Sequence, residues 1–172
     1  MDANQLPADL VSFCEAEHPR LVGALSLYCG DVQVAEELAQ EAIAHAIRDW
    51  ARIRTKSSPA AWVHRIALNL AHLYFRRKGA ERRAKERLQV IAAEEPDGDN
   101  ATAASVRAAV AELPRRQRQA LVLRHFLDLP VVQVADLMGC SEGTVKALTH
   151  QAIRNLRQSE GLNTLREASD AV

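Results

Sequence analysis

The sequence predicts an all-α protein in which two small helical domains are joined by a flexible linker. Apolar residues recur at three- and four-residue intervals in both halves of the chain, the spacing of one helix face. N-capping residues, prolines and glycines stand where these stripes begin and end. Residues 89–105 hold few large apolar side chains and cannot bury a core. We therefore expect domains at 9–88 and 106–160, separated by a flexible acidic linker at 89–105.

The first two expected helices form the acidic end of the chain. The stripe from residue 9 to 28 predicts a helix that is bent or broken at Pro19 and stopped by Gly30. Asp31 can cap a second helix that runs to Trp50 and buries alanine, leucine and isoleucine along one side. The other side is acidic, either because it keeps the domain in solution or because it meets a basic helix of another protein.

A third helix is expected from Ala60 to Lys78. Ser58 and Pro59 provide its N-cap and first turn, and Gly79 is expected to end or kink it. The apolar spacing places six residues on its inward side: Trp62, Val63, Ile66, Ala67, Leu70 and Leu73. Elsewhere on this helix, basic groups interleave with aromatic rings, which suits single-stranded DNA because bases stack on rings while phosphates pair with cations. In the alternative interpretation, the rings belong to the core and the arginines are solvated.

The C-terminal domain has the pattern of a helix-turn-helix. A helix is expected to begin at Pro114, with a buried side formed by Leu121, Val122 and the run 124–127. Pro130 restarts the chain, and a short helix over 131–138 follows. Gly139 can then take the left-handed conformation that turns the chain. Ser141 can cap a longer helix of the kind that enters a DNA major groove.

This last helix has a predicted core side and a predicted solvent side. At about 100° per residue, the core side collects Val145, Thr149, Ala152, Ile153 and Leu156. The solvent side collects Lys146, Ala147, His150, Gln151 and Arg154. In its first turns, Glu142 can accept from cytosine, Thr144 can touch a thymine methyl, and Lys146 can donate to guanine or phosphate. An ordinary solvated helix face is the alternative interpretation.

The charges are balanced overall but unevenly distributed. Residues 1–50 carry nine acidic and two basic side chains, whereas residues 62–88 carry eight basic and two acidic, and residues 115–157 seven basic and three acidic. Two basic segments predict two nucleic-acid contacts, and the acidic segment predicts a protein partner. The linker, about 17 residues long, spans roughly 55–60 Å when extended, so both domains can touch one DNA molecule.

The composition also limits the class of protein. No secretory signal and no bilayer-spanning apolar run is present, so we expect a cytoplasmic protein that does not insert into a membrane. Cys14, Cys29 and Cys140 are widely spaced and are expected to be reduced thiols. Cys14 and His18 lie four residues apart, but two ligands without a third do not make a metal site. We expect no metal and no cofactor.

The chain resembles the extracytoplasmic-function (ECF) group of bacterial sigma factors, the dissociable promoter-recognition subunits of RNA polymerase. The segment VAEELAQEAIAHAI is similar to the family's AEDLVQETF helix, and PAAWVHRIALNLAHLYFRR is similar to AWLYRIARNLALDHLRR. The segment LPRRQRQALVLRHFLDLPVVQVADLMGCSEGTVK is close to the family pattern over its full length. Together these stretches support a resemblance over residues 10–88 and 106–157.

The resemblance implies three binding surfaces. Core polymerase, through its beta-prime clamp helices, would be bound by Glu36, Glu37, Leu38, Gln40 and Glu41. The melted minus-10 element would be held by Arg54, Trp62, Arg65, Asn69, His72, Arg76 and Arg77. The duplex minus-35 element would be read by Arg124, Ser141, Glu142, Gly143, Thr144, Lys146, His150 and Arg154. The polymerase beta flap is a further implied partner, and an anti-sigma factor is compatible with these surfaces. No catalytic residue is implied, because the polymerase performs RNA synthesis.

The chain departs from the family pattern within the last helix. Where the family commonly reads VKSRLHRAL, this chain reads VKALTHQAI, so that Leu148 and Gln151 replace two arginines and Thr149 replaces a leucine. We therefore expect weaker binding to duplex DNA or an unusual upstream promoter element.

Two other classes of protein compete with the sigma-factor interpretation. A helix-turn-helix regulator that acts without polymerase would share the C-terminal pattern, but it has no obvious use for the acidic helix or the basic-aromatic helix. A helical enzyme would need polar groups that converge on a pocket, and no phosphate-binding loop or nucleophile elbow is present. We therefore expect a protein that is not an enzyme.

Overall fold

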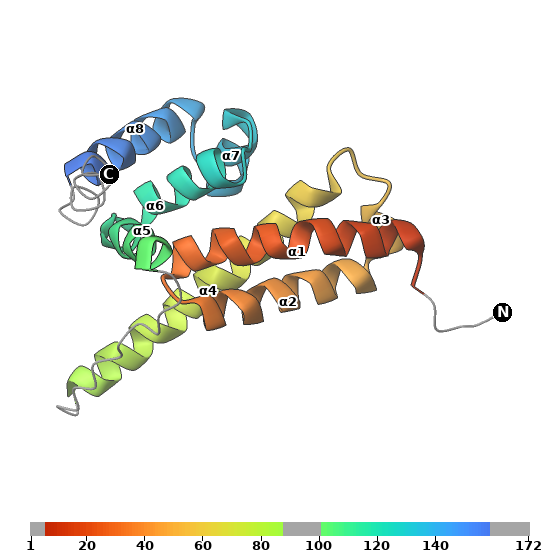
Figure 1. Ribbon diagram of the computed structural model, residues 1–172, viewed down its shortest axis with the longest axis horizontal. Helices are drawn as coiled ribbons and strands as arrows, with labels where there is room; N and C mark the ends of the chain where they lie inside the picture. Colours follow the sequence, from red (N-terminus) through yellow and green to blue (C-terminus); the bar gives the residue numbers. More distant parts are fainter. Residues whose placement is uncertain (1–5, 88–100, 159–172) are drawn as a thin grey trace. The chain divides into compact units, whose positions relative to one another are not determined.

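The computed structural model describes residues 6–87 and 101–158, which are helical with short connections and contain no strand (Figure 1). Its elements in chain order are α1 Ala8–Cys29, α2 Val32–Arg48, α3 Trp50–Ile53, α4 Pro59–Arg87, α5 Ala101–Glu112, α6 Arg115–Leu121, the π-helical turn η1 Val122–Phe126, α7 Val131–Met138 and α8 Glu142–Gln158. The all-α fold class is confirmed. Of the expected linker, residues 89–100 lie outside the described residues, whereas residues 101–105 belong to α5.

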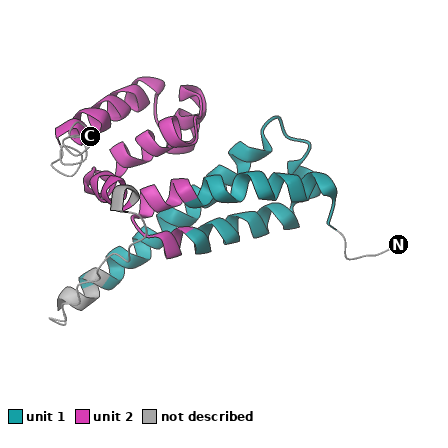
Figure 2. Ribbon diagram, viewed as in Figure 1, with its two compact units in different colours: residues 1–22, 36–97 teal, residues 23–35, 98–172 magenta. Residues whose placement is uncertain are grey.

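The chain divides into two compact units (Figure 2). The first contains residues 1–22 and 36–97, and the second contains residues 23–35 and 98–172. The corner between α1 and α2 therefore belongs to the second unit, a grouping that the sequence did not suggest.

The first unit is built on a core from α1, α2, α3 and α4. Its buried side chains are Leu10, Leu21, Leu38, Ala39, Ala42, Ile43, Ala46, Trp50, Ile53, Val63, Ala67, Leu68 and Ala71. The buried alanines on α2 and α4 are almost completely inaccessible, so neighbouring backbones can approach closely there. Phe13 packs on Trp50 with ring centroids 4.9 Å apart, which connects α1 to α3.

The buried face of α4 differs from the predicted one. Val63 and Ala67 are buried as expected, but Leu73 is 44% exposed, and His64 and Leu68 are buried instead. Regular helical spacing predicts an inward side that extends to Leu73. The structure shows that the core side of the helix instead passes through Ala71.

Helix starts were predicted well, whereas neither Pro19 nor Gly79 ends its helix. Asp31 Oδ1 accepts from Val34 N over 3.1 Å, and Ser58 Oγ accepts from Ala61 N over 3.2 Å, so both N-caps are confirmed. However, α1 continues through Pro19, where both Pro19 and Glu15 are exposed, so water can satisfy the carbonyl group that proline leaves unpaired. α4 also continues through Gly79, because the helix formers that flank it offset the cost of a glycine, about 1 kcal/mol.

The second unit contains α5, α6, η1, α7 and α8 around a core of its own. The buried residues that these elements and their connections contribute are Ala109, Val110, Leu113, Ala120, Val122, Leu123, Leu127, Leu129, Val134, Ala135, Met138, Val145 and Ala152. Pro130 precedes α7, as predicted, whereas Pro114 is the N-cap of α6 and lies one position before the helix rather than in its first turn. The turn between α7 and α8 is also as predicted, with Gly139 in the left-handed conformation at φ +60°.

The run 124–127 is not the buried side that the sequence suggested. Residues 124–126 lie in the π-helical turn η1, and Leu127 is the one buried residue of the run. Phe126 is 46% exposed and His125 is also exposed. A π turn contains an extra residue compared with an α turn, so the apolar spacing expected for a continuous α-helix does not hold through it.

Candidate nucleic-acid and polymerase interface

Most of the predicted minus-10 residues of α4 share one face. Arg65, Asn69 and Arg76 are exposed, and His72 is half-buried. At about 100° per residue, these four residues fall within an arc of about 60°, close to Trp62 at its edge. Arg77 is also exposed, but it lies about 100° beyond Arg76 and therefore on another face of the helix.

The two other predicted minus-10 residues have partners within the first unit. Arg54 Nη1 lies 3.6 Å from Asp9 Oδ2, and the same carboxylate oxygen accepts from Trp50 Nε1 over 3.3 Å. The guanidinium of Arg52 lies over the ring of Trp62, 5.9 Å from its centroid, which is the range of a cation–π contact. Trp62 is half-buried, so its ring belongs neither wholly to the core nor wholly to the surface. The sequence did not indicate the contact of Arg52 with Trp62 or that of Asp9 with Arg54.

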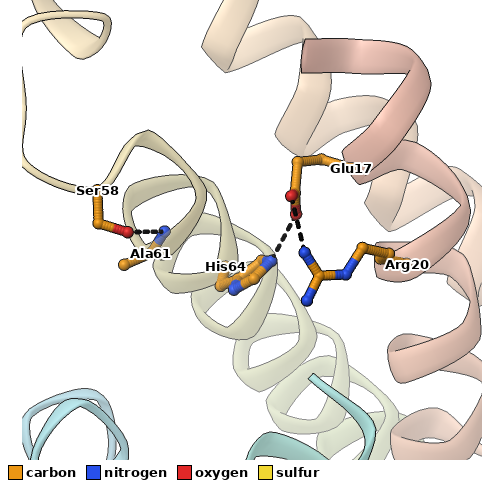
Figure 3. Close-up of polar contacts among 5 residues, drawn as sticks. All are labelled: Glu17, Arg20, Ser58, Ala61 and His64. Atoms are coloured by element: carbon orange, nitrogen blue, oxygen red, sulfur yellow. Dashed lines mark hydrogen bonds and ion pairs between the residues drawn. The ribbon is translucent and has the colours of Figure 1, made fainter. Parts of the chain in front are cut away.

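A buried polar cluster links α4 to α1 (Figure 3). His64 Nε2 and Glu17 Oε2 are 2.8 Å apart, and Arg20 Nη1 donates to Glu17 Oε1 over 3.0 Å. The side chains of His64 and Glu17 are only 1% and 7% exposed, while that of Arg20 is 46% exposed. The cluster joins α1 to α4 across 47 positions of sequence, and sequence reasoning missed it.

The geometry of this cluster indicates how its protons are arranged. The hydrogen bond from His64 lowers the pKa of the Glu17 carboxyl below its usual value. Burial raises this pKa by less, and the charges of His64 and Arg20 lower it further. His64 Nδ1 is buried and has no hydrogen-bond partner in the described part of the chain. A proton on Nε2 lets His64 donate to the Glu17 carboxylate, whereas a proton on Nδ1 is buried without an acceptor among the described residues.

The predicted polymerase-binding face of α2 is acidic and accessible, with one exception. Glu36, Glu37, Gln40 and Glu41 are all exposed. Leu38 is only 9% exposed and belongs to the core of the first unit, so it is not available as a surface contact. Leu38 and the acidic residues lie on different faces of the same helix, and the linear motif did not separate them.

The start of α8 has the geometry of a recognition helix. Ser141 Oγ accepts from Thr144 N over 3.1 Å, which confirms the predicted N-cap. The residues expected to read DNA from this helix and its cap are all exposed: Ser141, Glu142, Gly143, Thr144, Lys146, His150 and Arg154. On the opposite side, Val145 and Ala152 are fully buried. Thr149 is half-buried and donates its hydroxyl to Val145 O over 2.8 Å, so it is accommodated on the core side.

Arg124, the eighth predicted minus-35 residue, has a structural contact. Its Nη1 donates to the carbonyl of Leu129, and its side chain is half-buried. This bond connects η1 to the segment that leads into α7. Part of the guanidinium that the resemblance assigned to a phosphate is therefore used to hold the helix-turn-helix together.

Arg118 has a related structural role at helix ends in the second unit. Its guanidinium donates to the carbonyls of Leu113 over 3.1 Å and of Ala111, both at the end of α5, and to the carbonyl of Tyr28 over 2.9 Å. The last carbonyls of a helix have no partner within it, so one arginine satisfies several of them. Burial lowers the pKa of Arg118, while a nearby Tyr28 opposes that shift.

No metal site or membrane span is found in the part of the chain that the structure describes. Cys14 and His18 are half-buried, and no group of three or more potential ligands gathers around them or elsewhere in residues 6–87 and 101–158. Burial raises the pKa of the Cys14 thiol. Among the same residues, no helix combines the length and the apolar character that crossing a bilayer requires.

Known families match both halves of the chain. Residues 13–81 match sigma-70 region 2, and residues 103–156 match sigma-70 region 4. The chain is 30% identical to the RNA polymerase sigma-E factor of Streptomyces antibioticus over 124 residues, which are 72% of this chain and 69% of the relative. It is 29% identical to the RNA polymerase sigma-H factor of Pseudomonas aeruginosa over 148 residues, covering 77% of this chain and 76% of that one.

The fold is also similar to a solved structure. The sigma factor RpoE of Bartonella quintana, solved in complex with the anti-sigma factor NepR, superposes with a TM-score of 0.70 at 21% identity, over 88% of this chain and 96% of that one. Two family matches in the expected order, around a helical fold with a capped helix-turn-helix, agree with the motifs in the sequence. The chain belongs to the ECF group of the sigma-70 family of RNA polymerase sigma factors.

Proposed function

We propose that this sigma factor binds promoter DNA through two separate surfaces, the exposed face of α4 and the exposed face of α8. The observation that carries the proposal is the shared arc of Arg65, Asn69, His72 and Arg76 on α4, because basic and polar side chains on one face can follow a single strand. The α8 surface provides the duplex contact, with Lys146 and Arg154 facing solvent beyond a capped first turn.

The third proposed surface is the acidic face of α2, which would bind the beta-prime clamp helices of core polymerase. Four exposed residues form it: Glu36, Glu37, Gln40 and Glu41. Its charge is complementary to a basic helix, and such pairing gives fast and specific association. The polymerase beta flap is a further proposed partner. Bacterial polymerase works in the cytoplasm, so the proposal assigns the chain to that compartment, and it assigns no catalytic step to the chain itself.

An anti-sigma factor is a further proposed partner. The related RpoE of Bartonella quintana was solved with the anti-sigma factor NepR. A protein of this class would act by covering the proposed polymerase-binding surface or one of the proposed DNA-binding surfaces. Loss of core-polymerase binding on addition of such a protein would be the observation that identifies it.

The test is run-off transcription with core polymerase and the purified chain on a genomic library. We expect defined start sites that depend on the chain and that reveal both promoter elements. Binding to duplex DNA without retention on core polymerase would instead support a helix-turn-helix regulator.

Neighbouring residues of α4 offer a matched comparison for the single-strand contact. Arg76 and Arg77 carry the same charge and are both exposed, but only Arg76 lies on the shared face. We expect Arg76→Ala to reduce promoter opening, measured by permanganate reactivity of unpaired thymines, several times more than Arg77→Ala. Equal losses would mean that charge alone matters and that the proposed face is wrong.

A further inference from the structure

Three side-chain amides connect α6 to the solvent-facing edge of α8. Asn155 Nδ2 donates to Gln117 Oε1 over 2.8 Å, and Gln117 Nε2 donates to Gln151 Oε1 over 3.3 Å. Asn155 and Gln117 are half-buried, whereas Gln151 is exposed. The chain of hydrogen bonds therefore begins at the packed interface of the two helices and ends at a surface residue.

Gln151 lies on the part of α8 that is proposed to face DNA. At about 100° per residue, it falls within about 20° of Thr144 and about 40° of Ala147, both of them exposed. Arg154 lies about 60° away on the other side of Ala147. Gln151 therefore extends the row that starts at the capped first turn of the helix.

The bond from Gln117 fixes which end of the Gln151 amide is presented outward. Its oxygen is directed toward Gln117 Nε2, so the amino group, which only donates, is left for another molecule. Reading of adenine by glutamine needs the oxygen and the amino group to face the base together, which this orientation does not provide. An amino group alone pairs with an acceptor such as guanine O6 or N7, or a phosphate oxygen.

We propose that Gln151 contacts the upstream promoter duplex as a hydrogen-bond donor, and that Gln117 is a positioning residue that holds it in this orientation. The inference rests on the proposed function, in which α8 reads duplex DNA. Gln151 stands where the family commonly has an arginine. A neutral amide releases no counterion from DNA when it binds. This contact therefore adds affinity for duplexes that place an acceptor correctly, without adding to the salt dependence of binding.

The test uses holoenzyme assembled from core polymerase and the full chain. A duplex pool randomised in the upstream element is selected with the wild type, and binding to the selected duplex is then measured for Gln151→Ala, Gln117→Met and the double variant. Methionine has a length similar to glutamine but cannot donate to Gln151. We expect each single variant to weaken binding about three- to tenfold, the effect of one hydrogen bond, with an unchanged salt slope.

The double variant separates positioning from a general structural role. If Gln117 acts through Gln151, Gln117→Met has little further effect once residue 151 is alanine. An undiminished effect in that background would overturn the positioning role. Wild-type binding by both single variants would overturn the whole inference. If the wild-type holoenzyme selects no sequence at all, the proposed function fails instead, and the two failures are thus distinguishable.

Modified duplexes identify the acceptor. Replacement of guanine by 7-deazaguanine removes N7, and a methylphosphonate linkage removes a charged phosphate oxygen. We expect one of these changes, at one position, to weaken the wild type but not Gln151→Ala. A contact to N7 predicts sensitivity to 7-deazaguanine, and a backbone contact predicts sensitivity to methylphosphonate. A contact to O6 predicts sensitivity to a third duplex, in which 2-aminopurine replaces guanine and removes O6. If none of the three duplexes distinguishes the two proteins, Gln151 makes no such contact and the inference is wrong.

Discussion

Replacement of His64 by leucine tests whether the buried cluster stabilises the first unit. Leucine has a similar volume but cannot donate to Glu17, so a carboxylate that is 7% exposed would keep only its bond to Arg20. Loss of a hydrogen bond to a buried charged group typically costs about 1–3 kcal/mol, and the burial of the Glu17 carboxylate places the expected loss near the upper end, at about 3 kcal/mol. For a domain of this size, about 4 °C per kcal/mol gives a fall in Tm of about 12 °C.

Tryptophan fluorescence is a suitable assay because it reports on this unit alone. The chain has two tryptophans, Trp50 and Trp62, and both belong to the first unit. His64→Gln is the matched control, since an amide can still donate to the carboxylate, and we expect it to lose much less stability. A His64→Leu protein that unfolds at the wild-type temperature would refute the reasoning, because the contact between His64 and Glu17 would then contribute nothing to the stability of the first unit.

The same cluster predicts the pH dependence of stability. The folded-state pKa of Glu17 is lowered, so its contribution is complete above its ordinary value of 4.5 and is lost as pH falls through the lower folded value. Glu17→Gln should therefore show a flatter loss of stability on acidification, measured by urea unfolding at successive pH values. A variant with the same acid dependence as the wild type would contradict this assignment.

Three further predictions concern the second unit. Gly139→Ala should cost about 1 kcal/mol because Gly139 has φ +60°, whereas Gly139→Asn should cost less; urea unfolding followed by circular dichroism measures both. Arg118→Met should destabilise the unit by about 2 kcal/mol, since buried carbonyls lose a charged donor; the same unfolding assay tests this, and an unchanged midpoint would contradict it. Lys146→Ala with Arg154→Ala should weaken promoter binding at every sequence and reduce the salt slope by about 2, whereas an unchanged slope would mean that neither residue meets phosphate.

The sequence predicted the local signals of this fold better than the partners of its polar residues. Ser58, Asp31, Ser141 and Gly139 act within a few positions of themselves, so their capping and turning roles can be read from neighbouring letters. Interruptions were predicted less well, because one glycine, such as Gly79, costs little in a helix whose other residues favour that conformation.

The candidate sites show the same difference between local signals, which the sequence predicted, and distant partners, which it did not. Exposure of the α8 residues follows from helical spacing and was predicted. The burial of His64 was not predicted, because its partner Glu17 lies 47 positions away on another helix and no neighbouring residue indicates the pairing. Similarly, Arg124 has the charge of a phosphate ligand, but it lies in a π turn and donates to the Leu129 carbonyl, and no simple periodicity predicts either feature.

The π-helical turn also has a consequence for how this protein can be altered. The turn contains one residue more than an α turn, so removal of a single residue between Val122 and Phe126 would leave an ordinary α turn, and the side chains that follow would still face the same way. The same deletion in α8, near Lys146, would rotate every residue beyond it by about 100° and turn Ala152 out of the interior. The chain can therefore be shortened by one residue at the π turn with far less disturbance than within a regular helix.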